Sequence, residues 1–204
     1  MIKSFASLLI YSFILIFSLS SCTALMSKMY GVNQIDGVNE EEIHQFYAAI
    51  DFKGIQTDKV IIDSSAFQSL REHENDSIKK DLSQPVQIHY FNNSDLASFH
   101  ANCYAKGSLK NLDWNYQNRF ESFFPISAVE DLNTYPSLQR LNKMITDVDI
   151  SSENEIVITV FWTRMLEDIS RDAVNTVLAN ISEFNKEDEV RLILINTDSF
   201  FSKI

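Results

Sequence analysis

The last third of the chain has the clearest pattern of apolar and polar positions. Ile156–Trp162 and Val190–Ile195 are almost continuously apolar, as strands covered on both faces of a sheet are. Between them, apolar residues recur at helical spacing from Leu166 to Phe184. A strand, a long helix and a second strand predict a βαβ unit, in which the strands are parallel and the crossover is right-handed.

The earlier part of the chain predicts a helix, a strand and a second helix. Asn39 is a good N-cap before three glutamates, and apolar residues follow it at helical spacing as far as Ile50. Lys59–Asp63 predicts a short buried strand, and the next helix is expected to run from one of the two serines after it to Leu82. Pro85 ends that helix, because proline cannot continue the backbone hydrogen bonding.

Two apolar-rich segments around a polar turn predict a β-hairpin. Its strands are Val86–Phe91 and Phe99–Ala105. A hairpin centred after Ser94 places His89 opposite His100, and alternation with period two sorts the side chains onto two faces. The apolar face is expected to hold Val86, Ile88, Tyr90, Phe99, Ala101 and Cys103. The polar face is expected to hold Gln87, His89, Ser98, His100 and Asn102.

The segment after the hairpin is rich in aromatic residues and precedes a further helix. Residues 106–127 are expected to be irregular, and a helix is expected over 128–145, restarted at Pro136. The aromatic side chains could face a carbohydrate or a peptide, but clustered aromatics more often bury one another, so core packing is the favoured interpretation. They are Trp114, Tyr116, Phe120, Phe123 and Phe124.

Composition and charge narrow the class of protein. The 204 residues are 45% apolar, which is typical of one folded domain with a hydrophobic core. The chain has 28 acidic and 17 basic residues, a net charge of −11. Nucleic acid and anionic membrane surfaces would both repel such a chain, so no nucleic-acid partner is expected and any membrane attachment needs a lipid. No glycine-rich phosphate loop, Gly-x-Ser-x-Gly or His-Glu-x-x-His motif is present.

The first 22 residues have the layout of a secretory signal. Lys3 begins it, Phe5–Leu19 is an apolar run too short for a membrane span, and small residues precede Cys22. The sequence Leu19-Ser20-Ser21-Cys22 resembles the lipobox of bacterial lipoproteins. The resemblance implies that residues 1–21 are a signal peptide and that the mature chain begins at an acylated Cys22, which anchors it in the lipid bilayer.

The rest of the chain divides into a lead-in and one domain. Residues 22–38 lack strong periodicity and are interpreted as a tether, which leaves 39–204 as a single domain. Thr23, rather than aspartate, follows the lipid site, and this favours sorting to the outer membrane in some bacteria. The chain as a whole also resembles lipoproteins of Bacteroidota-type bacteria, a family with no established activity to carry over.

The stretch Val157–Asp198 resembles the core of a thioredoxin-like domain. The similar residues are the strand that ends Val160-Phe161-Trp162-Thr163, the helix after it and the strand that ends Ile195-Asn196-Thr197-Asp198. In secreted thioredoxin-like proteins a Cys-x-x-Cys pair lies at the start of that helix, where this chain has Leu166 and Ile169. The redox pair of the family is therefore absent.

The earlier half is similar to the back part of the same fold, in which a proline precedes a hairpin. The bond before that proline is cis in the family, so the resemblance implies a cis Gln84–Pro85 bond. No hairpin follows the last strand, so the elements would be in a rearranged order. The fold expected is a three-layer α/β/α thioredoxin-like domain with a mixed, permuted central sheet of about five strands.

A candidate ligand cleft lies at the carboxyl ends of the two parallel strands, where α/β sheets bind ligands. It is formed by Trp162, Arg164, Glu167, Asn196 and Asp198. A plainer interpretation is favoured, in which Glu167 complements the helix dipole and Trp162 belongs to the core.

Two other groups of residues could carry chemistry. Cys103 has no intrachain partner once Cys22 is lipidated, and a buried core position is favoured over a reactive thiol, which needs exposure and a positive neighbour. His89 and His100 are too few for a structural zinc site, so they are interpreted as solvated. No metal or cofactor is expected.

The favoured function is a non-catalytic binding or accessory module of the cell envelope. It would be held at the membrane by its lipid and would bind a protein or a small ligand. The alternative is a thiol oxidoreductase that uses Cys103. A third interpretation is a structural accessory in envelope assembly.

Overall fold

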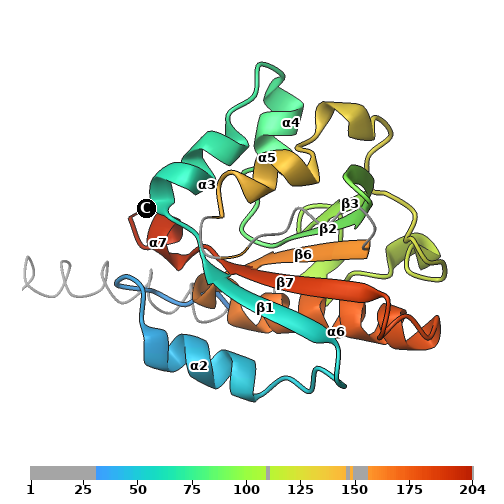
Figure 1. Cartoon of the computed structure of the whole chain (residues 1–204). Coiled ribbons are helices and arrows are strands. Elements are labelled where there is room, and N and C mark those ends of the chain that lie inside the picture. The colour runs from blue at the N-terminus through green and yellow to red at the C-terminus, as the bar shows by residue number, and fades with distance from the viewer. Residues whose placement is uncertain (1–30, 109–110, 146–147, 149–155, 204) are drawn as a thin grey trace, which may run out of the picture.

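A mixed β-sheet of five strands lies at the centre of the computed structural model, which describes residues 31–108, 111–145, 148 and 156–203. The strands are β1 (Gln56–Ile61), β2 (Gln87–Asn92), β3 (Asp95–Ala101), β6 (Ile156–Trp162) and β7 (Val190–Asn196). Their order in the sheet is β1-β7-β6-β2-β3 (Figure 1). β1, β7 and β6 are parallel, whereas β2 pairs antiparallel with both β6 and β3. A separate two-stranded ribbon consists of β4 (Lys106–Ser108) and β5 (Asn111–Asp113).

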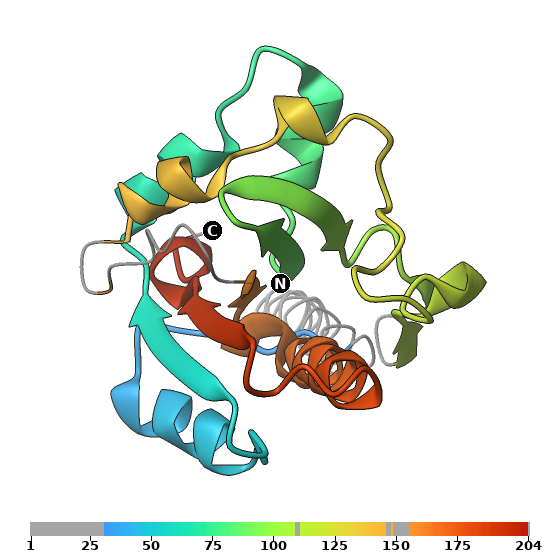
Figure 2. The ribbon, with the colours of Figure 1, turned by 45° about the vertical axis from the view of Figure 1, so that its right-hand side comes forward.

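Helices cover both faces of the sheet. They are α2 (Glu40–Ala48), α3 (Ser64–Arg71), α4 (Asp76–Asp81), α5 (Leu138–Asn142), α6 (Glu167–Glu183) and α7 (Asp198–Phe201). α2 and α6 pack on one face, and α3, α5 and α7 pack on the other. α4 lies on the same side as α3 and covers β3, and Figure 2 shows the sheet between the two helix layers. The prediction of an α/β fold with a mixed sheet of five strands is confirmed.

The predicted βαβ unit is confirmed in its elements and in its strand direction. β6 has the expected bounds, β7 is one residue longer, and the two strands pair in parallel from Ile156 with Val190 to Trp162 with Asn196. α6 connects them and begins at Glu167. Nearly every residue of both strands is buried, because helices cover the two faces of the sheet.

Capping residues divide two of the predicted helices. The helix expected from the serines after β1 to Leu82 is instead α3 and α4, because Asn75 accepts hydrogen bonds from the backbone of the first turn of α4. The helix expected over 128–145 is reduced to a 3₁₀ turn at Leu132–Thr134 and the short α5. Ser137 caps α5 directly after Pro136, where the restart was predicted, but the part before Pro136 forms only the 3₁₀ turn.

β1 differs from its prediction in position and in burial. It begins at Gln56, three residues earlier than expected, and ends at Ile61. Val60 is buried on the face that packs against α3, but most of the strand is exposed or half-buried. The reason is topological, because β1 lies at the edge of the sheet and has a neighbour only on the side of β7.

The predicted register of the hairpin is wrong, by two residues next to the turn and by one residue beyond a bulge. Asn92 pairs with Asp95 across a two-residue turn in which Asn93 has a positive φ of 56°. A bulge between Tyr90 and Phe91 shifts the pairing again, so that His89 lies opposite Phe99. A one-residue slip moves side chains to the other face, so the predicted apolar and polar faces are wrong as well.

Both faces of the hairpin are buried. Ile88 and Tyr90 pack in the cluster with α6, whereas Phe99 and Ala101 pack in the cluster with α4. Polar side chains of the hairpin are therefore enclosed between the sheet and its two helix layers.

The Gln84–Pro85 bond is trans, so the cis geometry that the resemblance implies is wrong. Trans is the ordinary preference of a bond before proline. In this form the Gln84 carbonyl accepts a hydrogen bond of 2.7 Å from the Gln87 side chain, which fixes the entry into β2.

Candidate functional site

The loops after β6 and β7 meet at one edge of the sheet, as parallel strands require. Trp162 and Asn196, the last residues of the two strands, are direct neighbours in the register. Thr197 follows in the β7 loop, and its backbone N–H donates to the Trp162 carbonyl at 2.9 Å. Arg164 and Asp198 thus come from different loops but lie side by side.

An enclosed ion pair joins these loops. Arg164 Nε donates to Asp198 Oδ2 at 2.6 Å, and the Arg164 backbone N–H and the Thr163 hydroxyl both donate to Oδ1, at 2.9 and 2.7 Å. Asp198 has no exposed surface and Arg164 is 6% exposed. Burial lowers the pKa of Arg164, but the hydrogen bonds and charges of Asp198 and Glu42 outweigh this effect and raise the pKa above its ordinary value.

The segment before α2 crosses the same edge of the sheet. We call residues 32–38 the strap. The backbone N–H of Asn33 donates to the Met165 carbonyl at 2.8 Å, and its side-chain amide donates to the Arg164 carbonyl at 3.0 Å. Arg164 in turn donates through Nη2 to the carbonyl of Gly37. The strap, which is the end of the predicted tether, is therefore in direct contact with the β6 loop.

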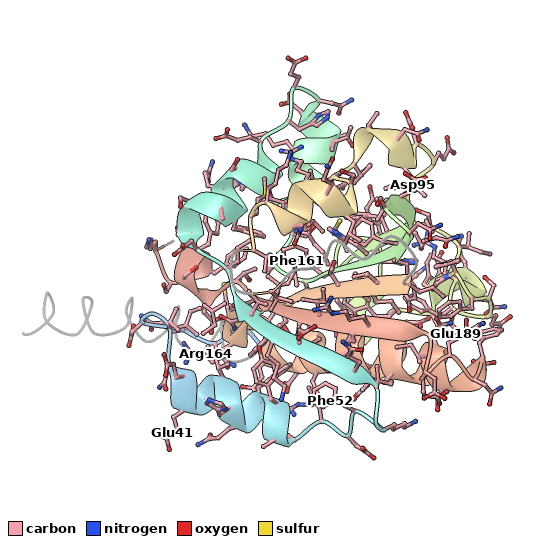
Figure 3. All side chains as sticks on the ribbon, in the orientation of Figure 1. Glu41, Phe52, Asp95, Phe161, Arg164 and Glu189 are labelled. Atoms are coloured by element: carbon pink, nitrogen blue, oxygen red, sulfur yellow. The ribbon has the colours of Figure 1, made fainter. Side chains whose placement is uncertain are left out.

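Arg164 also contacts α2. Its Nη1 pairs with the carboxylate of Glu42 in the first turn of that helix. Figure 3 shows Arg164 between the end of β6 and the N-terminal end of α2. The local sequence places Glu42 there, because Asn39 caps the helix by accepting hydrogen bonds from the backbone of Glu41 and Glu42.

A pocket of about 540 Å³ opens beside Arg164. Residues 34–42 form the rest of its lining, from the strap to the first turn of α2. Among the described residues that line it, Arg164 supplies the positive charge and four side chains are acidic. These are Asp36, Glu40, Glu41 and Glu42.

The five residues of the predicted cleft do not line one open cavity. Arg164 alone lines the pocket, whereas Trp162, Asn196 and Asp198 are fully buried. Glu167 instead pairs with Arg171 one turn further along α6, at 2.6 Å. The burial of Trp162 agrees with the favoured interpretation that it belongs to the core.

Trp162 belongs to an aromatic cluster under α2. Its ring stacks on Phe46 at a centroid distance of 3.8 Å and an angle of 8°, and the edge of Tyr47 meets it at 5.3 Å. Arg171 lies over the Phe46 ring, 5.2 Å from its centroid. Asn196 Nδ2 is buried nearby and has no hydrogen-bond partner in the described part of the chain. The cluster holds α2 against the carboxyl ends of β6 and β7.

Cys103 is exposed, so the prediction of a buried core position is wrong. The reason is that β3 ends at Ala101, and Cys103 lies in the turn after it. Its thiol is nevertheless partly desolvated and close to Asp81, and these two effects raise the pKa of Cys103 from 9.0 to about 11. A thiol with this pKa is protonated at neutral pH and is a poor nucleophile.

His89 and His100 are buried, so their interpretation as solvated residues is wrong. His89 packs against Phe99 and Phe161, and His100 packs against Phe120. They hydrogen-bond to Gln87 Oε1 at 3.1 Å and to Ser98 Oγ at 2.9 Å. Desolvation lowers the pKa of each histidine to about 3. Within the described residues no group of three or more acidic, histidine or cysteine side chains is arranged to hold a metal ion.

One cluster was not anticipated from the sequence. The carboxyl group of Asp81 accepts hydrogen bonds from the hydroxyls of Tyr104 at 2.8 Å and Tyr135 at 2.6 Å. The three residues border a pocket of about 360 Å³ that α4 and residues of the segment 128–135 line. Asp81 and Tyr135 are 54 positions apart, and no local pattern links them.

Four of the five aromatic residues from Trp114 to Phe124 pack as expected, whereas Tyr116 is half-buried outside the core, under Lys106. Trp114 and Phe120 are buried in the cluster with α6, and Phe123 and Phe124 pack against it from outside. Asn180 of α6 ties this segment down, because its side-chain amide donates to the carbonyl of Phe120 at 2.9 Å.

Cys22 and the whole predicted signal lie outside the described residues, as does Thr23. In the parts of the chain that the structure describes, none of the helices has the length and apolar character needed to cross a bilayer. Comparisons with protein-family models, with curated proteins and with solved structures found no significant match.

Proposed function

We propose that this chain is a lipid-anchored protein of the bacterial cell envelope whose domain binds a partner without catalysing a reaction. The observation that carries the proposal is the burial of two apolar residues directly after β6. Leu166 and Ile169, at the positions where the resemblance implies a redox pair, are buried at 4% and 1% exposure. These positions therefore supply apolar packing and no thiols. The residues around them form the ion pair between Arg164 and Asp198 and the contacts with the strap.

The sheet supports a rearranged thioredoxin-like domain. A βαβ unit stands at its centre, and the β2–β3 hairpin lies antiparallel beside the first strand of that unit. The hairpin precedes the βαβ unit in the chain, which is the order expected if the fold is permuted. Strand order and strand direction are the basis of this assignment.

The alternative function, a thiol oxidoreductase, depends on Cys103. Exposure of this residue favours the alternative, since a reactive thiol must be reached by its substrate. The raised pKa of Cys103 disfavours it, because partial burial and then the neighbouring Asp81 oppose formation of the thiolate. Because a protonated thiol is a poor nucleophile even when it is exposed, we favour the binding function over the oxidoreductase.

The lipid anchor is tested by metabolic labelling with an alkyne fatty acid in a bacterial host. Wild type is expected to take up the label and to fractionate with membranes, whereas Cys22→Ser takes up none. Cys103→Ser is the matched control and should be labelled like wild type, because the lipobox selects only Cys22. Labelling of the Cys22→Ser variant would refute the anchor.

The binding role is tested by crosslinking in the envelope. Glu41 is exposed and lines the pocket, so Glu41→Lys reverses a charge there without disturbing the core. Glu74→Lys makes the same change on the exposed loop before α4 and serves as the matched control. A partner crosslinked to wild type and to the control, but several-fold less to Glu41→Lys, is the expected result. Equal yields from both variants would exclude the pocket as the binding site.

A further inference from the structure

The strap is held at the end of β6 by the kind of contacts that any extended peptide can make. The core accepts hydrogen bonds from Asn33 through the carbonyls of Met165 and Arg164. In the other direction, Arg164 donates to the main-chain carbonyl of Gly37. On the side of the core these contacts use two backbone carbonyls and one guanidinium. The contacts with the Met165 carbonyl and with the guanidinium use only the backbone of the strap, whereas the contact with the Arg164 carbonyl uses the side-chain amide of Asn33.

Arg164 has an inner and an outer half. Its Nε and backbone N–H are fixed on the buried carboxylate of Asp198. Its two terminal nitrogens face outward and contact the strap and Glu42 at the border of the pocket. The ion pair with Asp198 therefore holds the guanidinium in place, while the outer contacts can be exchanged for others.

The strap is weakly attached in comparison with the elements around it. Its residues are half-buried or exposed, and Val38 is 43% exposed. Val32 packs against the core cluster from outside. A segment with few buried contacts opens at a lower free energy than the strands beneath it.

We propose that the strap is a displaceable cover of this edge of the sheet. A partner binds as an extended peptide segment that takes the place of the strap on the Met165 carbonyl and on the outer nitrogens of Arg164. The strap thus occupies the site within the same chain. When it leaves, Arg164 and residues 39–42 of the pocket lining remain to contact the partner, and displacement couples partner binding to the segment that leads towards the anchor. This inference rests on the proposed binding function.

Gly37 provides a selective way to loosen the strap. Its φ is +134°, which side-chain-bearing residues rarely adopt, and a Cβ there would meet no atom within 4 Å. Gly37→Ala therefore strains the strap without a clash. Gly54→Ala is the matched control, since Gly54 also has a positive φ, of +80°, and open space, in the loop before β1. Hydrogen exchange of residues 32–38 in the full chain is expected to accelerate about tenfold in Gly37→Ala and to stay unchanged in Gly54→Ala.

The second measurement uses a fluorescent synthetic peptide with the sequence of residues 31–38 as the probe. Because apparent affinity scales with the open fraction, Gly37→Ala is expected to bind the probe about tenfold more tightly than wild type or Gly54→Ala. Asn33→Ala, which removes an exposed side chain and its contact with the Arg164 carbonyl, should shift both measurements in the same direction.

Two results would overturn the inference. One is unchanged exchange of the strap in both Gly37→Ala and Asn33→Ala, which would show that the strap does not open. The other is faster exchange without any gain in probe binding, which would show that the exposed edge does not accept a peptide. Neither result bears on crosslinking of the wild-type chain to an envelope partner, so failure of the cover and failure of the binding function remain distinguishable.

Discussion

Two buried histidines, His89 and His100, make the stability of the domain depend on pH. The pKa of His89 and that of His100 are both about 3 in the folded protein, against an ordinary value of 6.5, because burial removes water from the charged form. Between these two values the unfolded chain binds protons that the folded chain does not. Stability is therefore complete above pH 6.5 and is lost progressively as the pH falls towards 3.

His89→Gln tests this dependence. The variant is expected to lower the slope of unfolding free energy against pH by up to about 1.4 kcal/mol per pH unit between pH 6 and 4. Urea denaturation at a series of pH values measures it. His44→Gln, on the exposed side of α2, is the matched control for a change of histidine to glutamine. A His89→Gln slope equal to that of wild type would contradict the assignment of a buried neutral imidazole.

Cys103 is exposed, but its thiol is expected to react slowly. A shift of the pKa from 9.0 to about 11 lowers the thiolate fraction at pH 7 about 100-fold, so alkylation of the native protein should be slower by that order than alkylation of the unfolded chain. Asp81→Asn is expected to accelerate the native reaction, because Asp81 raises this pKa. Native labelling by iodoacetamide as fast as in urea would favour the oxidoreductase instead.

At the scale of elements, the Asp81 cluster connects three segments that are otherwise loosely joined. Asp81 ends α4, Tyr104 lies in the turn after β3, and Tyr135 follows the 3₁₀ turn. Tyr135 is 9% exposed and Tyr104 is half-buried. The hydrogen bond to Tyr135 is therefore the better shielded of the two. Its loss leaves the buried carboxyl group of Asp81 with only the half-buried Tyr104 as a hydroxyl donor.

Tyr135→Phe is expected to lower the free energy of unfolding by about 1.5–3 kcal/mol, the usual contribution of a hydrogen bond to a charged group. Tyr104→Phe should have a smaller effect, because water can replace its hydroxyl. Tyr116→Phe, in the half-buried ring that stacks under Lys106, controls for the general loss of a phenol hydroxyl. An equal loss of stability in all three variants would show that the cluster has no special role.

The strength of the sequence signal explains which elements could be predicted. β6, α6 and β7 are long and strongly periodic, and their bounds agree with the sequence to within a residue or so. The helix expected to run to Leu82 is divided at Asn75, because capping competes locally with helix propagation. The helix expected over 128–145 restarts after Pro136, as predicted, at the cap Ser137. The register of the hairpin could not be predicted, because alternation of apolar and polar residues indicates the two faces of a strand only when one face is solvated. Here both faces are buried.

At the scale of the whole molecule, the location of the site could be predicted from the sequence, but the burial of its residues could not. Parallel strands bring their carboxyl ends together, so the proximity of Arg164 and Asp198 followed from the βαβ pattern. Their burial did not follow, because it depends on a strap that precedes Arg164 by more than a hundred positions. Long-range contacts of this kind leave no local signal in a single sequence, and the Asp81 cluster escaped prediction for the same reason.

The net charge of −11 should make the stability of the whole molecule depend on salt. Like charges on a compact surface repel one another, and raising the ionic strength from 0.01 to 0.1 M shortens the screening length from about 30 to about 10 Å. The free energy of unfolding is therefore expected to rise by on the order of 1 kcal/mol over this range, as urea titrations would measure.

A charge variant isolates the part of this dependence that comes from the pocket. Glu40 and Glu41 are exposed at the start of α2, so Glu40→Gln/Glu41→Gln should reduce the dependence of stability on salt. Arg164 and Asp198 are shielded from ions, so their pair resists screening and stabilises the edge of the sheet at every salt concentration. Stability that fell as salt was added would show that attractive pairs outweigh the acidic excess.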